Sequence, residues 1–124
     1  MGDTEIEEMY TYLTIRSDPD YTRSVAIGPL VEFLRGQPEL VQASPQAFSN
    51  APGSPWVDLC FANADETGCY AIGAAPLPPT VNIVELVCGS GDEQWYESLA
   101  RRIAAYLCWE AVEEHSGQTL YHAD

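Results

Sequence analysis

The stretch VNIVELVCGSGDEQWYESLARRIAAYL, residues 81–107, decides the fold because it joins the most apolar strand of the chain to its clearest helix. Its first eight residues form an apolar run with one Asn and one Glu, which is typical of a strand at the centre of a sheet. The following Gly-Ser-Gly-Asp ends the strand, and its Ser or Asp92 can cap a helix. Trp95, Leu99 and Ile103 then recur at helical spacing and predict a core-facing stripe.

The first 55 residues predict a strand, a short helix and a possible second strand. Residues 5–16 alternate between apolar positions and Tyr or Thr, a period of two that predicts a strand. Residues 29–35 predict a helix that begins with a proline, or earlier near Ser24, and ends at a glycine in the left-handed conformation. A short strand is possible at 39–44. The prolines of 45–55 indicate a loop.

The middle of the chain predicts a hairpin. Residues 56–63 alternate cleanly, and an Asp-Glu-Thr-Gly turn predicts that 69–72 return as a second strand. That register places Phe61 opposite Ile72, so that large side chains share one face. Residues 74–79 contain three prolines and are expected to form an extended connector.

Two structures are possible after residue 107. The helix can continue, or it can break near Cys108 and be followed by a hairpin with strands at 109–114 and 118–122; we favour the hairpin because of the Ser-Gly between them. The whole chain, 1–124, then predicts a single α+β domain: an antiparallel or mixed sheet of five to seven strands with two helices packed on one face. The expected element order is β-α-β-β-β-β-α-β-β. The predicted core residues are Val57, Leu59, Phe61, Ile83, Leu86, Leu99 and Ile103.

Charge is the strongest functional signal in this sequence. The net charge is −14, because 19 acidic residues are opposed by five basic residues, all of them arginine. Such a surface repels nucleic acid and anionic lipid and attracts a cationic protein, so we expect a basic protein partner and neither nucleic acid nor membrane. The apolar runs are too short to span a bilayer, and the acidic opening residues are unlike a signal peptide. We therefore expect a cytoplasmic protein.

Catalytic and metal-binding patterns are weak. The four cysteines form no Cys-x-x-Cys pair, so we predict no metal and no cofactor. The Gly-Ser-Gly-Asp turn lacks the lysine of a phosphate-binding loop, and the chain has no lysine at all. A small enzyme would have to use Cys108 with His115 or His122, in surroundings that are acidic rather than cationic. We expect a binding protein and not an enzyme.

The candidate binding residues combine tyrosines with acids in turns. If Leu13 and Ile15 face the core, the tyrosines beside them face outward, where aromatic rings and carboxylates suit Arg- and Lys-rich partners. The residues predicted to contact the partner are Tyr10, Tyr12, Asp18, Asp20, Asp65, Glu66, Glu110, Glu113 and Glu114.

The C-terminal third resembles the small acidic immunity proteins of bacterial polymorphic toxin systems. The resemblance lies in the apolar strand 81–87, in EQWYE at 93–97 and in IAAYLCWEAVEE at 103–114. It implies an inhibitor that binds and neutralises a cognate toxin, commonly a basic nuclease, and it implies no catalytic residues. An adaptor or chaperone for a secreted effector is the alternative, which an unpaired edge strand or a large apolar patch would favour.

Overall fold

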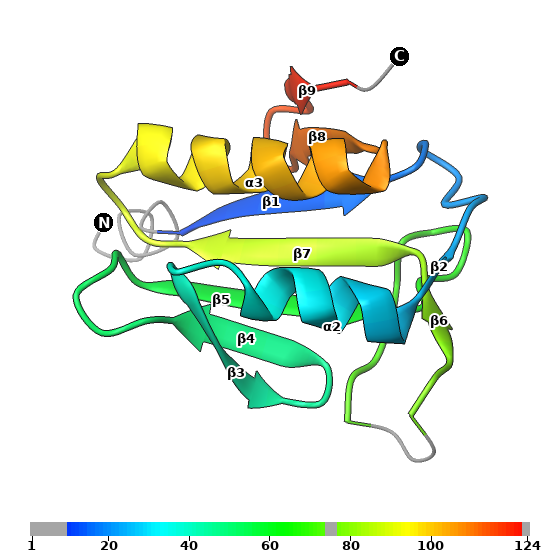
Figure 1. Ribbon diagram of the computed structural model, residues 1–124. Helices are drawn as coiled ribbons and strands as arrows, with labels where there is room; N and C mark the ends of the chain where they lie inside the picture. The colour runs from blue at the N-terminus through cyan, green and yellow to red at the C-terminus, as the bar shows by residue number, and fades with distance from the viewer. Residues whose placement is uncertain (1–9, 74–76, 123–124) are drawn as a thin grey trace.

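The computed structural model describes residues 10–73 and 77–122 and has two layers, an antiparallel sheet and two helices. Figure 1 shows both helices in front of the sheet, which confirms the predicted α+β class. The main sheet has seven strands in the order β3-β4-β5-β7-β1-β8-β9, and a second sheet has two, β2 and β6. The elements are β1 (Thr11–Arg16), β2 (Val25–Ala26), α2 (Ile27–Arg35), β3 (Leu40–Ser44), β4 (Ala47–Asn50), β5 (Val57–Ala62), β6 (Thr80–Val81), β7 (Ile83–Cys88), α3 (Glu93–Leu107), β8 (Glu110–Glu113) and β9 (Thr119–Tyr121).

Strand β7 is central, as its apolar sequence predicts. It pairs with β1 on one side and with β5 on the other, so that Leu86 lies opposite both Leu13 and Leu59. All three side chains are buried. Because alternate residues of a strand point to opposite faces, this register directs one apolar row from each strand toward the helices.

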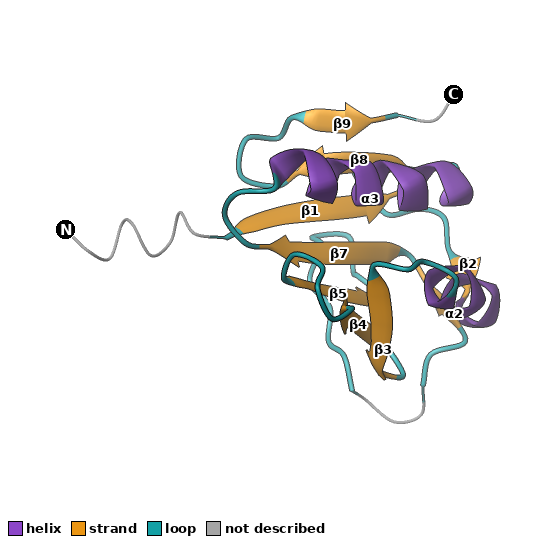
Figure 2. Ribbon diagram, turned by 60° about the vertical axis from the view of Figure 1, so that its left-hand side comes forward, coloured by secondary structure: helices purple, strands orange, loops and turns teal. Residues whose placement is uncertain are grey.

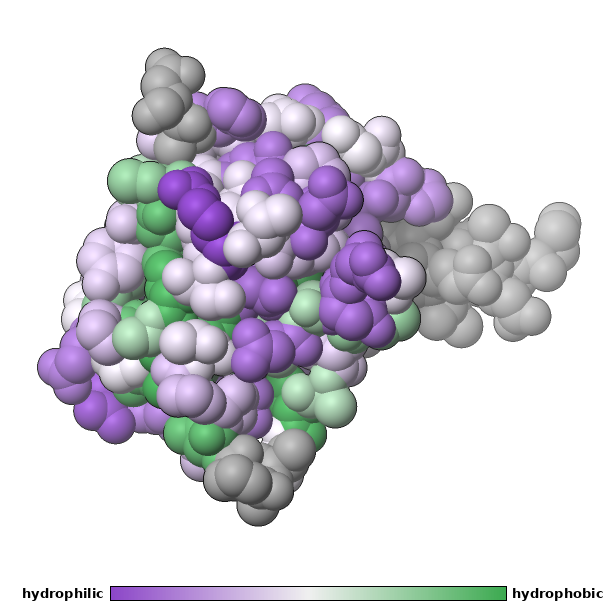
Figure 3. Space-filling view, turned by 90° about the vertical axis from the view of Figure 1, so that its right-hand side faces the viewer, coloured by the Kyte–Doolittle hydropathy of each residue, from purple (hydrophilic) through white to green (hydrophobic). Residues whose placement is uncertain are grey.

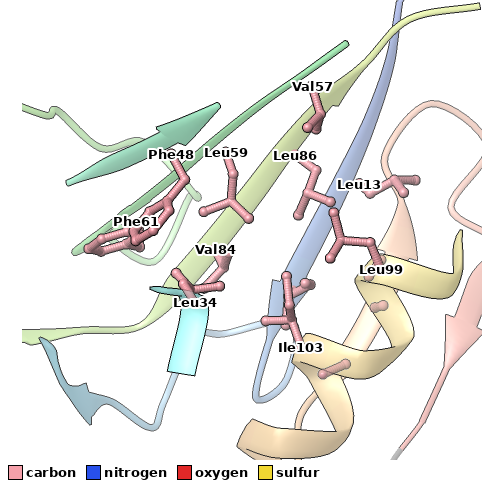
Figure 4. Packing of buried hydrophobic residues seen from close by; sticks show 14 of the residues in the cluster. Leu13, Leu34, Phe48, Val57, Leu59, Phe61, Val84, Leu86, Leu99 and Ile103 are labelled. Carbon is pink, nitrogen blue, oxygen red and sulfur yellow. The ribbon is translucent and has the colours of Figure 1, made fainter. Parts of the chain in front are cut away.

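The core fills the space between the sheet and the two helices. Figure 4 shows Leu34 of α2 and Leu99 and Ile103 of α3 directed at the apolar row of the sheet. All seven predicted core residues are buried. On α3 the buried aromatic residue is Tyr96, whereas Trp95 is only partly buried.

Helix α3 ends in a way that places the hairpin after it. Cys108 adopts a left-handed conformation, with φ 59°, and the backbone N–H of Trp109 donates to the carbonyl of Ala104. Trp109 is buried, and β8 and β9 follow as the predicted hairpin rather than as a helical extension. The predicted left-handed glycine after α2 is wrong, because Gly36 has φ −79°, an ordinary right-handed value.

The predicted loop at 45–55 is wrong because it contains β4. The prolines of this stretch flank Ala47–Asn50 and do not interrupt it, so four residues are free to pair with β3 and β5. Phe48 of β4 lies opposite Leu59 and packs near Phe61, with ring centroids 6.2 Å apart. Packing in the core stabilises β4, although the local sequence alone does not favour a strand there.

The predicted return strand at 69–72 is also wrong. The turn itself forms, and in it the Asp65 N–H donates to the carbonyl of Cys69. The segment after the turn cannot pair with β5, because both edges of β5 are already occupied by β4 and β7. The chain leaves the sheet, and Ile72 is 48% exposed rather than opposite Phe61. The element order of the main sheet is still the predicted one, with β4 in place of 69–72.

Smaller differences concern the bounds of elements. The run 81–88 is divided at Asn82, whose side chain bonds the backbone of Ala64 and of Tyr21, so that Val81 pairs with β2 and Ile83 begins β7. Residues 5–9 of the predicted strand 5–16 and residues 74–76 of the predicted connector lie outside the described residues. Neither α2 nor α3 is long and apolar enough to cross a membrane.

Candidate partner-binding site

A groove of about 710 Å³ lies between the start of β1, the first turns of α3 and the β8–β9 turn. Figure 1 shows β1 and α3 starting at the same end of the molecule. The floor includes Leu13 and Cys88, and carboxylates and phenols surround it. Figure 2 shows β9 at the sheet edge beyond α3, and Gln118 and Leu120 of this region line the groove. We call this feature the β1–α3 groove; its polar and aromatic lining residues are Tyr10, Thr11, Tyr12, Glu93, Tyr96, Glu97, Glu113, His115 and Gln118.

Two tyrosines at the start of β1 form the rim of the groove. Tyr10 is 45% exposed and Tyr12 is 44% exposed, because the β alternation that buries Leu13 turns them outward. The Tyr10 ring packs against the Trp56 ring at 5.7 Å between centroids. The Tyr96 hydroxyl, which also lines the groove, donates to the carbonyl of Trp56 at 2.5 Å and accepts the Gly89 N–H at 3.1 Å. Burial raises the pKa of Tyr96, so this phenol stays a neutral part of the framework.

Three carboxylates line the walls. Glu93 and Glu97 stand four residues apart on α3 and therefore share one helical face. Glu113, at the end of β8, accepts the backbone N–H of His115 at 3.0 Å and that of Ser116 at 2.8 Å. Partial burial works against ionisation, but these hydrogen bonds outweigh it and lower the pKa of Glu113, which is anionic at neutral pH.

The carboxylates of the groove are poorly neutralised. Among the described residues that line it there is no arginine, and its one salt bridge joins Glu97 to Arg101 at 3.9 Å on the exposed surface of α3. An exposed pair of this kind screens little charge. The opposite end of the molecule, which carries β2 and β6, exposes hydrophilic residues with apolar ones between them (Figure 3). The groove is therefore an anionic recess that offers aromatic rings.

A second polar cluster lies on the sheet face that the helices leave uncovered. The Thr14 hydroxyl is 2.9 Å from Glu85 Oε2 and 3.0 Å from Glu114 Oε2, while the Tyr70 hydroxyl donates to Glu85 Oε1 at 2.7 Å. A cavity of about 280 Å³ adjoins the cluster, with Arg16 on its wall. Thr14 has a single hydroxyl proton and can donate to only one carboxylate, so a proton on the other carboxyl completes the arrangement.

Glu85 is the residue that holds this proton. Glu85 is only 8% exposed, and this burial is the main cause that raises its pKa to about 7. The hydrogen bond and charge interaction with Glu114 raise the pKa further. The hydrogen bonds from Tyr70 and Thr14 oppose the rise. Burial also raises the pKa of Tyr70, whose hydroxyl lies 3.4 Å from the Cys60 thiol. The cluster gains or loses its proton near neutral pH.

The structure divides the predicted binding residues among several places. Tyr10, Tyr12 and Glu113 line the β1–α3 groove together. Glu114 lies in the polar cluster. Glu110 forms an ion pair with Arg16 at 2.7 Å that leaves 12% of its side chain exposed, so its charge is already compensated.

The remaining predicted residues lie in two turns. Asp18 accepts hydrogen bonds from the Thr22 hydroxyl and the Asp20 backbone N–H, and these bonds lower its pKa. Asp65 accepts from the hydroxyl and backbone N–H of Thr67 and from the Cys69 N–H, which lower its pKa likewise. These aspartates organise their own turns, and their neighbours Asp20 and Glu66 are exposed outside the groove.

Three acidic or aromatic residues of the groove are not expected from sequence: Glu93, Tyr96 and Glu97. The i, i+4 spacing of the two glutamates was visible, but their position beside β1 follows from long-range packing of α3. His115 lines the groove and is exposed, as is His122. Cys108 precedes β8 and His115 follows it, so this strand separates them. Within the described ranges, no group of three or more His, Cys, Asp or Glu side chains is placed to hold a metal ion.

Comparison with protein-family models, with curated proteins and with solved structures gives no match to this chain, so the groove is interpreted from its own geometry.

Proposed function

We propose that this protein is a non-catalytic binding protein that captures a basic protein partner in the β1–α3 groove. The observation that carries the proposal is a groove lined by three carboxylates, with two exposed tyrosines at its rim and no arginine among the described residues that line it. Those side chains come from β1, α3 and β8, so a folded sheet and helix hold them in place. No cofactor, metal, nucleic acid or membrane enters this function.

Charge and aromatic contact have separate roles in such binding. The net charge of −14 attracts a cationic surface from a distance and acts mainly on the association rate. Affinity then depends on a few desolvated anchors, typically about 2 kcal/mol or more each, and aromatic residues are common among them. Tyr10 and Tyr12 are candidates for such anchors because both are exposed, and the Tyr10 ring packs against the Trp56 ring.

We further propose that the physiological role is that of an immunity protein, which neutralises a cognate bacterial toxin in the cytoplasm. The support is the resemblance of the C-terminal third to such proteins. The segments that carry it contribute Glu93, Glu97 and Glu113 to the groove. A toxin with a basic surface, such as a nuclease, has the chemistry that this groove accepts.

An adaptor or chaperone for a secreted effector is the second candidate. It is favoured by β3, which lies at one edge of the sheet and exposes 44% of Val41. An extended segment of an effector would pair with that edge through backbone hydrogen bonds. A register shift between Gln42 and Ser44 interrupts the edge and works against such pairing.

Binding of a labelled basic peptide with equal numbers of Arg and Lys tests the groove. We expect Glu93→Gln with Glu97→Gln to weaken binding several-fold and to slow association, with a smaller effect at high salt. The matched control is Asp58→Asn with Glu32→Gln, which removes the same charge from exposed positions outside the groove. Equal weakening by both pairs would show that only net charge matters, and salt-independent binding through β3 would favour the adaptor.

A further inference from the structure

We infer that a chain of hydrogen bonds through Glu85 is a pH-sensitive latch, which holds the β8–β9 turn against the sheet while Glu85 is protonated and releases it when Glu85 ionises. The latch lies on the sheet face that the helices leave uncovered, and its members are Thr14, Tyr70, Glu85 and Glu114. The inference concerns how the turn is held, so it does not depend on the proposed function.

The four side chains come from distant parts of the sequence and meet because of the strand register. Thr14 of β1 lies opposite Glu85 of β7 on one side and opposite Val112 of β8 on the other. Glu114 follows β8 directly, and its side chain reaches back to the Thr14 hydroxyl. Tyr70 reaches Glu85 from the segment that leaves β5. These contacts give the β8–β9 turn a side-chain connection to the two central strands β1 and β7.

With a proton on Glu85, all hydrogen bonds of the latch run in one direction. The Tyr70 hydroxyl donates to Glu85 Oε1 at 2.7 Å. The proton on Glu85 Oε2 then lies between that oxygen and the Thr14 hydroxyl oxygen, 2.9 Å away. The Thr14 hydroxyl is left free to donate to Glu114 Oε2 at 3.0 Å. Each hydroxyl donates once, and the chain ends on an ionised carboxylate, which is the stronger kind of acceptor.

Loss of that proton leaves two carboxylates to compete for the single proton of Thr14. Glu85 is 8% exposed and fixed in the central strand β7, whereas Glu114 is exposed at the start of a turn. A buried anion needs the hydrogen bond more than an exposed one, so Thr14 donates to Glu85, and Glu114 is repelled into solvent. The released turn also carries Glu113 and His115, so opening of the latch changes one wall of the β1–α3 groove.

The surroundings permit this change without unfolding. The cavity of about 280 Å³ beside the pair has room for water to hydrate ionised Glu85. Arg16 is the one cation among the described residues that line the cavity, and it is already paired with Glu110 at 2.7 Å. The pKa of about 7 for Glu85 sets the transition near neutral pH. The other titratable or charged groups around Glu85 are Tyr21 on the cavity wall, Asp58 and Cys60 of β5, and Glu113 of the turn.

Carbon-13 relaxation at the Cα positions of the full chain measures the mobility of the turn. The order parameters of residues 114–117 are expected to fall from about 0.85 at pH 5.5 to about 0.6 at pH 8.5, with a midpoint near pH 7, while those of β7 stay constant. Unchanged order parameters in the turn over this pH range would overturn the inference.

Two variants fix the latch in opposite states. In Glu85→Gln the amide oxygen accepts from Tyr70 and the amide nitrogen donates to Thr14, so the turn should stay ordered at pH 8.5. Thr14→Val removes the bridging hydroxyl and should leave the turn mobile at both pH values, whereas Thr14→Ser should restore the pH dependence. If Thr14→Val does not fold, Glu85→Gln and Thr14→Ser decide the question.

His115→Gln is the matched control, because histidine is the other side chain of the turn that can change its charge near neutral pH. This variant should keep the pH-dependent fall in order parameters. A fall that persists in Glu85→Gln, or one that disappears in His115→Gln, would assign the effect to a group other than Glu85 and overturn the latch.

Discussion

The shared proton of Glu85 predicts that this protein becomes less stable as pH rises toward neutrality. The pKa of Glu85 is about 7 in the folded chain, against an ordinary value of 4.5. Between these values the folded state binds more protons than the unfolded state, so the free energy of unfolding falls with rising pH and levels off above pH 7. This is opposite in sign to Asp18, Asp65 and Glu39, whose lowered pKa values make stability fall as pH drops below about 4.

The magnitude follows from the size of the shift. At 1.36 kcal/mol per pKa unit, the full difference corresponds to about 3 kcal/mol. The cavity beside the cluster and the exposure of Glu114 admit solvent screening, which reduces this value, so we expect roughly 1–2 kcal/mol between pH 5 and pH 8. For a chain of this length that is a change of about 4–8 °C in Tm.

Urea unfolding of the wild type and of Glu85→Gln between pH 5 and pH 8.5 measures the effect. Glutamine remains neutral and can still accept a hydrogen bond from the Tyr70 hydroxyl. The free energy of unfolding of the variant should therefore fall much less with rising pH, and at pH 8 the variant should be more stable than the wild type. Glu32→Gln removes an exposed acid on α2 and should keep the decline. Parallel pH profiles for the wild type and Glu85→Gln would refute the shared proton.

Two further predictions concern the fold. Leu99→Ala should destabilise by about 2–5 kcal/mol in urea, because Leu99 is fully buried between α3 and the sheet; a loss below about 1 kcal/mol would contradict this packing. Cys108→Gly should stabilise by about 0.5–1 kcal/mol, since Cys108 has φ 59° and glycine relieves that strain, while Cys108→Ala should not stabilise. Equal melts for the glycine and alanine variants would show that Cys108 is unstrained.

Local sequence patterns predict an element correctly when the spacing of its apolar residues matches the face that is buried in the folded protein. The apolar run in β7, the helical stripe in α3 and the hairpin after Cys108 were all predicted correctly. Two strands were misjudged because strand pairing is a long-range property. Strand β4 is short and flanked by prolines, yet Phe48 secures it in the core. The segment 69–72 has a strand-like composition but no free strand edge beside β5.

The binding site is partly predictable from sequence, because some of its features follow from local alternation and others from long-range contacts. Alternation in β1 showed that Tyr10 and Tyr12 face away from the core, and both do. Sequence alone could not show that Glu110 is neutralised by Arg16, a partner 94 residues earlier in the chain. Nor could it place Glu93 and Glu97 in one groove with the start of β1, because the groove arises only when α3 packs across β1.

The location of the bound peptide tests the central claim most directly. Nitrogen-15-labelled protein would be titrated with the mixed Arg and Lys peptide and followed by amide chemical shifts. We predict that the largest changes cluster at 10–13, 93–97 and 113–120, the segments that line the β1–α3 groove. Largest changes in the turns at 18–20 and 65–66, or along β3, would contradict the assignment of the groove as the binding site.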